Sequence, residues 1–185
     1  MGLDISKQEV KHAEMRAVHR GLNNIKFVVA DMEQNPLPEN MIDVVISNGA
    51  FCLAPNKAKA FSEIYRVLKP GGRMSVCTST VKMDLEPGVT WPVCMRMFIN
   101  IKEIEPICKD IGFENIIVDT SNDLMSYELP DFEEEKEAAE ARKEDADTRS
   151  KNQVHVGSSE FKHLENFDMN KICSRVTVIA TKPLN

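Results

Sequence analysis

The stretch from residue 27 to residue 79 reads FVVADMEQNPLPENMIDVVISNGAFCLAPNKAKAFSEIYRVLKPGGRMSVCTS and decides the fold of the chain. Residues 41–47 form a β-branched apolar run, which is typical of a buried parallel strand. Residues 73–79 alternate between polar and apolar side chains, which predicts a second strand. The segment between them has one apolar helical face, at Phe61, Ile64, Tyr65 and Leu68. Strand, helix and strand with short loops form a right-handed crossover, so we expect an α/β fold.

Turn and capping residues mark the neighbouring elements. We expect the sequence Lys69-Pro70-Gly71-Gly72 to end the central helix, because proline cannot continue it and glycine tolerates a left-handed backbone. Residues 2–5 are interpreted as the end of a strand, and Ser6 with Glu9 forms a capping box that starts a helix. Gly21 is expected to end this helix, and residues 25–29 to form the next strand. The buried face of the helix is expected at Val10, Ala13, Ala17 and Val18.

The second half of the chain contains two clear strand–helix signals and one ambiguous segment. Residues 81–98 are compatible with a lid over a substrate pocket and equally with a plain connector. A helix with an apolar face at Ile101, Ile104, Cys108 and Ile111 should end at Gly112. We expect it to begin near Glu103, so that Pro106 falls in the first turn, where N–H groups have no intrahelical partner. Residues 113–119 and 172–180 predict two further strands.

Composition favours a single globular domain with one charged insertion. The chain has 185 residues and a net charge of −6, which does not indicate a nucleic-acid surface, and no apolar run reaches the length of a membrane span. Residues 131–152, DFEEEKEAAEARKEDADTRSKN, lack an apolar face and predict a solvated helix or a disordered segment. We therefore expect a core at residues 1–121, a charged acidic insertion at 122–171 and the closing strand of the core at 172–185.

Cysteine usage indicates a reducing compartment. The five cysteines are irregularly spaced and form no CxxC pair, which argues against both a disulfide framework and a zinc knuckle. We expect a cytoplasmic protein without a metal site. Cys77 and Cys173 fall within predicted strands and Cys108 on a helix face, so all three are expected to be inert core residues.

Residues 47–76, SNGAFCLAPNKAKAFSEIYRVLKPGGRMSV, resemble the region after the fourth strand of class I S-adenosylmethionine-dependent methyltransferases. They are most similar to the small-molecule branch that includes arsenite methyltransferases. The resemblance covers roughly residues 2–120 and the last strand. It implies a Rossmann-like, doubly wound sheet whose last strand pairs antiparallel with the fifth and sixth strands. It also implies S-adenosyl-L-methionine as cofactor and a small-molecule methyl acceptor, with no nucleic-acid or membrane partner.

The family's acidic, glycine-rich turn after the first strand has no counterpart in this sequence. In the family these glycines let the backbone approach the cofactor, as they do in dinucleotide folds. The chain begins where the second strand would end, so we expect an N-terminally incomplete sheet with exposed strand edges. It is interpreted as a fragment of a longer methyltransferase, a truncated gene model or a divergent remnant. The fragment or gene-model reading is favoured because the surviving local signals agree with one another.

The resemblance assigns cofactor-binding roles to residues after three strands. Asp4 would hold the ribose hydroxyls, with Ile5 following in the family's register. Asp31 would contact the adenine amino group, and Met32 would lie against the purine. Asn48 and Gly49 would lie beneath the methionine part and the sulfonium, where a small residue allows close approach.

An enzyme that catalyses methyl transfer has mainly to position the acceptor and exclude water. No residue in the sequence is singled out as a general base. His12 and His19 fall on the first helix and are expected at the surface. If the acceptor were arsenite, Cys52 and Cys94 would be the candidate thiolate ligands, since soft thiolates suit soft metalloids. The family cysteine after the fourth strand is replaced by Gly49, which argues against arsenite. Two alternatives to small-molecule methyl transfer thus stay open: a non-catalytic methyltransferase-like interaction module and an arsenite methyltransferase. The sequence does not indicate an oligomeric state.

Overall fold

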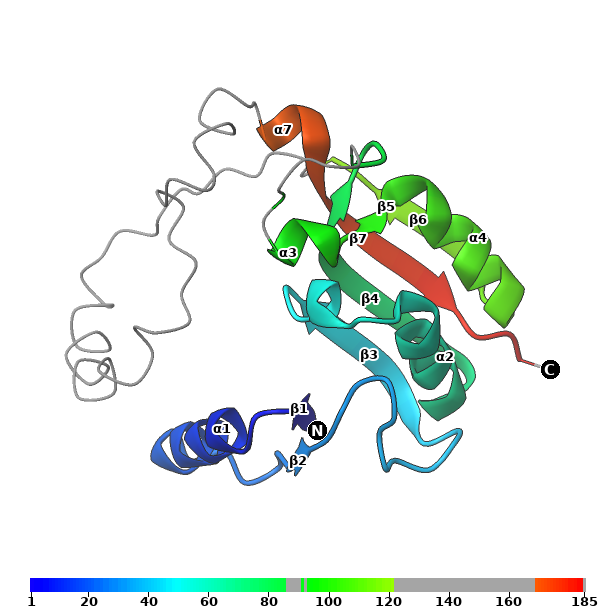
Figure 1. Ribbon diagram of the computed structural model, residues 1–185. Coiled ribbons are helices and arrows are strands. Elements are labelled where there is room, and N and C mark those ends of the chain that lie inside the picture. The colour runs from blue at the N-terminus through cyan, green and yellow to red at the C-terminus, as the bar shows by residue number, and fades with distance from the viewer. Residues whose placement is uncertain (86–90, 92, 122–168, 185) are drawn as a thin grey trace, which may run out of the picture.

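The computed structural model describes residues 1–85, 91, 93–121 and 169–184 (Figure 1). Its strands are β1 (Gly2–Asp4), β2 (Phe27–Val29), β3 (Ile42–Asn48), β4 (Leu68–Val81), β5 (Ile99–Asn100), β6 (Glu114–Asp119) and β7 (Cys173–Thr181). Its helices are α1 (Lys7–His19), the 3₁₀ turn η1 (Phe51–Leu53), α2 (Lys57–Val67), α3 (Val93–Arg96), α4 (Ile101–Ile111) and α7 (Met169–Ile172). The expected insertion at 122–171 lies almost entirely outside the described residues.

The strands form two separate sheets. Strands β1 and β2 pair in parallel, with Gly2 opposite Phe27. The larger sheet has the order β3-β4-β7-β6, with β5 paired beside the end of β4. Strand β3 runs parallel to β4, whereas β7 runs antiparallel to both β4 and β6, as the resemblance implied.

The strand order leaves one position empty. Within the described residues, β1 pairs only with β2 and β3 pairs only with β4, so each keeps an unpaired edge. Figure 1 shows β1, β2 and α1 lying beyond the β3 edge of the large sheet. The resemblance to class I methyltransferases implies a first strand between these two edges, and the described residues place no strand there.

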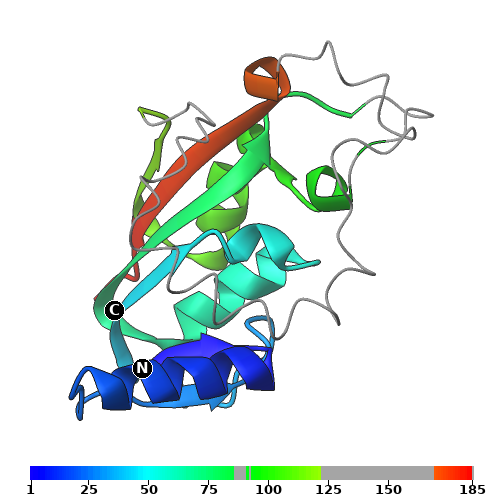
Figure 2. The same cartoon turned by 90° about the vertical axis from the view of Figure 1, so that its left-hand side faces the viewer.

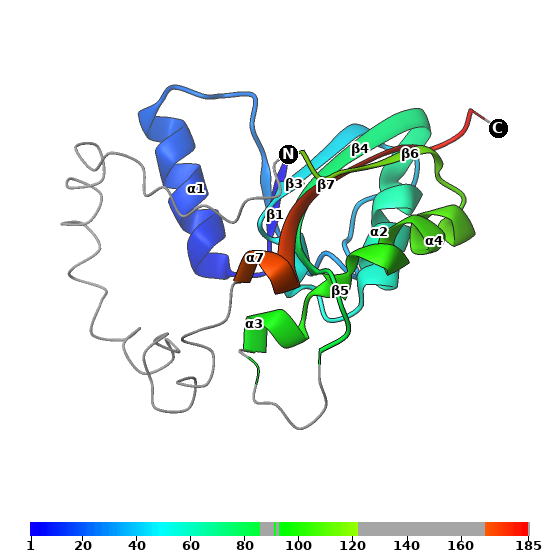
Figure 3. The ribbon, with the colours of Figure 1, turned by 90° about the horizontal axis from the view of Figure 1, so that it is seen from above.

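One face of the large sheet holds the hydrophobic core. Helices α2 and α4 contact each other and pack on this face. Figure 3 shows α1 on the other side of the strands from α2 and α4. The largest fully buried side chains of this core are Phe51, Phe61, Leu68, Met74, Val76, Ile104, Val176 and Val178.

The opposite face of the large sheet exposes apolar side chains. Ile46 of β3 is 80% exposed and Ile117 of β6 is 55% exposed. Val44 and Ile179, at 40% and 37%, belong to the same set. Figure 2 shows the two long strands, β4 and β7, crossing the molecule side by side. Side chains alternate between the faces of a strand, so these exposed residues lie on the face turned away from α2 and α4.

The first helix begins as expected and differs on its buried face. Ser6 caps α1, its hydroxyl accepting the Glu9 N–H at 3.3 Å. Val10 and Ala17 are buried, but Val18 is 79% exposed, so its assignment to the buried face was wrong. Among the described elements, the main contacts of α1 are with the short strands β1 and β2, and Val10 and Ala17 are its buried residues.

The Lys69–Gly72 turn does not itself end the central helix. Helix α2 already ends at Val67, and residues 68–72 run on as the extended start of β4. Gly71 adopts φ 76°, and its N–H donates to the Lys182 carbonyl at 2.9 Å. The Lys182 N–H in turn donates to the Gly72 carbonyl at 2.8 Å. Pairing with the end of β7 therefore draws these residues into the sheet.

Helix α4 starts earlier than expected and carries a proline in its interior. It begins at Ile101, two residues before Glu103, because Asn100 caps it by accepting the Lys102 N–H at 3.1 Å. Pro106 therefore lies inside the helix rather than among its first residues. The predicted stop at Gly112 is confirmed, and this glycine has φ 106°.

The ambiguous segment at residues 81–98 is described only in part. Val81, Trp91 and Met95 are buried together with Ile172 and Cys173, in a second apolar cluster. Residues 86–90 and 92 lie outside the described part of the chain, so the choice between lid and connector stays open.

Candidate functional site

The three pairs of predicted cofactor residues lie at the carboxyl ends of three strands. Asp4 closes β1, Asp31 follows β2 and Asn48 closes β3. In open parallel sheets, ligands bind outside the carboxyl ends of the strands. Asp4, Asp31 and Asn48 thus lie at strand ends, and their contacts with a cofactor stay a prediction.

Asp4 and Asp31 have the same local geometry. Asp4 Oδ1 accepts the Ser6 N–H at 2.8 Å, and Asp31 Oδ1 accepts the Glu33 N–H at 2.8 Å. Each carboxylate is thus held by the backbone two residues later, while its residue stays exposed. Oδ1 is occupied in both residues, so Oδ2 remains as an acceptor for hydroxyl or amino groups of a ligand.

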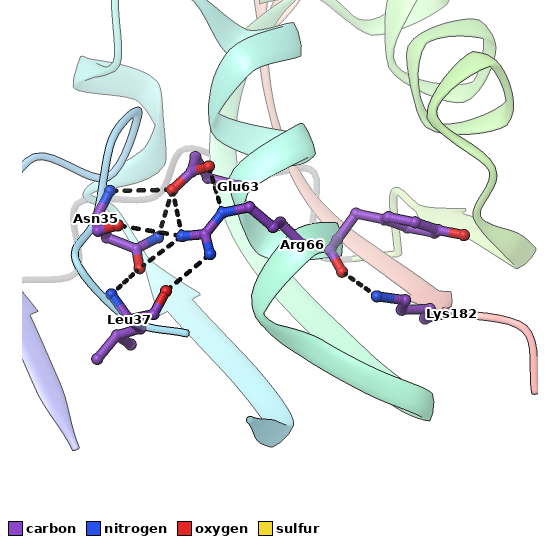
Figure 4. A network of polar contacts seen from close by, with 6 residues as sticks. Asn35, Leu37, Glu63, Arg66 and Lys182 are labelled. Atoms are coloured by element: carbon purple, nitrogen blue, oxygen red, sulfur yellow. Dashed lines mark hydrogen bonds and ion pairs between the residues drawn. The ribbon is translucent and has the colours of Figure 1, made fainter. Parts of the chain in front are cut away.

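The loop that carries Asp31 is tied to α2 by a polar network (Figure 4). Glu63 Oε2 accepts both the backbone N–H and the side-chain amide of Asn35, each at 3.0 Å. Arg66 donates to Glu63 at 2.8 and 2.9 Å and to the Leu37 carbonyl at 2.7 Å. The hydrogen bond from Arg66 lowers the pKa of Glu63, and burial acts in the opposite direction.

A second tie joins the same loop to the start of α2. Glu33 Oε1 accepts the Asn56 N–H at 2.6 Å, and Asn56 caps α2 by accepting the Lys59 N–H at 2.9 Å. Met32 packs against the main core from this loop. Glu63 and Arg66 lie within residues 47–76, the segment that carries the family resemblance, so this segment also positions the Asp31 loop. Sequence reasoning missed this role, since the partners are 28 or more residues apart.

For Ile5 and Gly49, the structure does not test the predicted contacts with a ligand. Ile5 is 71% exposed at the end of β1, so any contact it makes with a ligand stays a prediction. Gly49 adopts φ 78°, a conformation that favours glycine, and a Cβ built on it would meet no atom within 4 Å. The structure therefore explains Gly49 by its backbone conformation, and close approach of a ligand stays a prediction.

Asn48 has a partner that sequence reasoning did not find. Its Oδ1 accepts a hydrogen bond from Arg175 Nη2 at 3.2 Å. Arg175 Nε also donates to Cys77 Sγ at 3.1 Å. Cys77 is half-buried on the open face of the sheet, so its assignment to the core was wrong, whereas Cys108 and Cys173 are fully buried as expected.

Cys52 is buried in the turn after β3. Its thiol donates to the Gly49 carbonyl at 3.1 Å, and the buried Lys57 amine donates to the Cys52 carbonyl at 3.0 Å and to Ala54. Desolvation lowers the pKa of Lys57. Cys94 belongs to α3, but its side chain lies outside the described part of the chain, so the pairing of Cys52 with Cys94 stays a prediction. Across the described ranges, no three His, Cys, Asp or Glu side chains gather as metal ligands would.

Two cavities lie near these elements. One of about 670 Å³ is bounded by the start of α2, by α3 and by α4, with Lys57, Arg96, Phe98 and Glu103 in its lining. Its size suits a small organic molecule. The other, of about 240 Å³, lies between β1 and α1, with Asp4, His12 and Arg16 in its lining. His12 is half-buried there, whereas His19 is exposed as expected.

Comparison with known proteins identifies the fold. Residues 1–76 match a methyltransferase domain family. The structure matches phosphoethanolamine N-methyltransferase 2 of Haemonchus contortus, solved with phosphomonomethylethanolamine and S-adenosylhomocysteine, with a TM-score of 0.67 at 25% identity. The chain has the fold of the class I methyltransferases. S-adenosylmethionine is the cofactor of this family.

Other relatives extend the range of chemistry on this methyltransferase fold. The arsenite methyltransferase of Halobacterium salinarum is 22% identical over 148 residues, 76% of this chain. The structure of the [4+2]-cyclase SpnF matches with a TM-score of 0.71 at 24% identity over 100% of the chain. The chain spans 37% of that arsenite methyltransferase, 43% of the Haemonchus structure and 66% of SpnF.

The residues present fit part of the cofactor. The carboxylates of Asp4 and Asp31 can accept hydrogen bonds from hydroxyl and amino groups. The side-chain amide of Asn48 can donate to a carboxylate. The glycine-rich turn that would approach the cofactor from the first strand is missing from the sequence. None of the helices in the described ranges has the length and apolar character of a bilayer-crossing segment.

Proposed function

We propose that this chain supplies the second-strand, third-strand and fourth-strand parts of an S-adenosylmethionine site and takes part in methyl transfer to a small-molecule acceptor. The observation that carries this proposal is the matched geometry of Asp4 and Asp31, two exposed carboxylates held in the same way after two parallel strands. A cytoplasmic location belongs to the same proposal and is supported by the free thiols of Cys52, Cys77 and Cys108.

In this proposal, side chains of this chain bind the cofactor and orient it. Asp4 Oδ2 accepts from the ribose hydroxyls, and Asp31 Oδ2 accepts from the adenine amino group. Met32, anchored on the core, lies against the purine. The cofactor supplies an activated methyl group, so the protein has only to hold the acceptor and keep water out. No general base is assigned.

The acceptor is proposed to be a small organic molecule rather than arsenite. The cavity of about 670 Å³ beside α2 supports this choice, because its size and mixed polar lining suit such a molecule. The thiol of Cys52 already donates to a backbone carbonyl, so arsenite binding would first have to break that contact. A non-catalytic module is the second candidate, favoured by the open position between β1 and β3.

Calorimetric titration of the 185-residue chain with S-adenosylmethionine and S-adenosylhomocysteine tests the proposal. We expect micromolar binding, weakened about tenfold by Asp4→Asn and by Asp31→Asn, because each removes a charged acceptor. Asp119→Asn is the matched control, since Asp119 Oδ1 accepts the Ser121 N–H at 2.8 Å at the end of β6. Absence of binding by a chain with a cooperative unfolding transition would reject an autonomous cofactor site and favour the non-catalytic module.

A further inference from the structure

Arg175 reaches across the large sheet from β7 to β3. Cys77 of β4 pairs with Asn48 on one side and with Thr177 on the other. Arg175 lies two residues before Thr177 on the same face, because side chains two apart on a strand share a face. Its guanidinium contacts Cys77 Sγ through Nε and Asn48 Oδ1 through Nη2, at 3.1 and 3.2 Å. One side chain thus joins three neighbouring strands at the carboxyl end of β3.

This contact settles which way the Asn48 amide points. An arginine side chain has donors only, so Asn48 must turn its oxygen toward Arg175. The amide nitrogen, Nδ2, then lies on the other side of the group with two N–H donors to offer. Without Arg175, the amide could present either its oxygen or its nitrogen to a ligand, at similar cost.

We propose that Arg175 is a positioning residue that fixes Asn48 as a hydrogen-bond donor to the amino-acid part of the cofactor. The inference rests on the proposed function, in which Asn48 lies beneath the methionine part. A donor matches the carboxylate of that part, which offers acceptors only, whereas the α-ammonium group beside it requires an acceptor from another residue. Arg175 acts through Asn48 and is not itself assigned to a cofactor contact.

The test compares two ligands that differ in the amino-acid part. S-adenosylhomocysteine carries it, whereas methylthioadenosine has the same adenosine without it. Arg175→Met should weaken S-adenosylhomocysteine binding about fivefold to tenfold and leave methylthioadenosine binding unchanged, because only the first ligand accepts from Asn48. Arg175→Lys keeps a donor and should restore part of the loss.

Two further variants separate this role from a structural one. Asn48→Asp keeps the partner of Arg175 but removes the Nδ2 donors, so it should weaken S-adenosylhomocysteine binding at least as much as Arg175→Met. Arg73→Met is the matched control, since Arg73 is exposed on the same face of β4, four residues before Cys77 and opposite Thr181. Equal weakening of both ligands by Arg175→Met would overturn the positioning role.

A readout without ligand keeps the inference separate from the proposed function. In a ¹⁵N correlation spectrum, the Asn48 side-chain NH₂ signals are identified by their loss in Asn48→Asp. We expect Arg175→Met to shift them and Arg73→Met to leave them in place. Unchanged signals in Arg175→Met would overturn the orientation of the amide. If the wild-type chain binds neither ligand, the proposed function and the cofactor role of Asn48 fail together, while these signals still decide whether Arg175 orients the amide.

Discussion

Glu63 of α2 accepts both the backbone N–H and the side-chain amide of Asn35 through one carboxylate oxygen, each at 3.0 Å. The two residues are 28 positions apart, and the contact joins the loop after β2 to the helix before β4. Together with Arg66, it fastens the small sheet, and the Asp31 loop with it, to the large sheet. The stability of the chain and the order of its candidate site should therefore depend on the same carboxylate.

Replacing Glu63 by glutamine should destabilise the fold by about 2 kcal/mol, because hydrogen bonds to a charged group contribute about 1.5–3 kcal/mol. Arg66→Met should cost a similar amount, and the double variant should cost less than the sum. Urea unfolding of all three variants measures this. Lys109→Met is the control, since its exposed ion pair with Glu105 should contribute less than about 1 kcal/mol. Strictly additive losses would contradict a shared network.

The contribution of Glu63 should depend on pH. Its pKa is lowered below the ordinary value of 4.5, first by the hydrogen bond from Arg66. A carboxyl with a lowered folded-state pKa stabilises the fold fully above its unfolded value and loses that contribution as the pH falls through the folded value. The stability difference between wild type and Glu63→Gln should therefore be constant from pH 7 to about 5 and shrink below about pH 4.5. Unfolding curves across this range check the sign, and a difference that grows in acid would contradict it.

Gly72→Ala should be among the most damaging small substitutions in the chain. A Cβ at this position would lie 2.8 Å from the Lys69 carbonyl oxygen and 3.2 Å from the Asp43 and Ile42 carbonyl oxygens. These are backbone atoms, which cannot move without disturbing the β3–β4 pairing, so we expect a loss of about 2–4 kcal/mol. Gly71→Ala is the comparison, because its added Cβ meets only the Leu184 side chain. The main cost of that substitution is the strain of an alanine at a φ of 76°. A thermal midpoint that falls further in Gly71→Ala than in Gly72→Ala would refute the argument.

The cysteines should differ sharply in their reaction with iodoacetamide. Burial raises the pKa of Cys108 to about 12, so its thiolate is scarce at pH 8 and its sulfur is shielded. Cys77 is half-buried and lies on the open face of the sheet. Peptide mapping after mild alkylation should find Cys77 modified in the folded chain and Cys108 modified only in denaturant. Modification of both at one rate in the native chain would mean that the core opens far more readily than the packing indicates.

Ile46→Lys should reduce self-association without lowering the unfolding midpoint. Ile46 is 80% exposed on β3, whose outer edge has unpaired backbone groups among the described residues. Such an apolar edge is a template for pairing with another chain, and a charge on it opposes that pairing. Val18→Lys is the control, because Val18 is 79% exposed and belongs to helix α1 rather than to a strand. Sedimentation velocity measures the effect, and equal behaviour of the two variants would argue against pairing through β3.

The sequence by itself determined the local elements and the family resemblance of this chain. The Ser6 cap, the stop at Gly112 and the closing strand were confirmed, because each depends on residues within about one turn or one strand of each other. The apolar face of α2 was confirmed at Phe61, whereas Leu68, assigned to the same helical face, is buried as the first residue of β4. The unpaired facing edges of β1 and β3 among the described residues agree with the order of motifs along the chain.

Only the tertiary structure decided which side chains meet across long separations. Arg175 and Asn48 are 127 positions apart, and Arg175 and Cys77 are 98 apart, so no periodicity in either strand indicates the contact. The same holds for the exposure of Val18 and for the turn residues Gly71 and Gly72, which are drawn into β4 by the end of β7. Local patterns report which face of an element is apolar, whereas the partner that covers or completes that face is set by packing between distant segments.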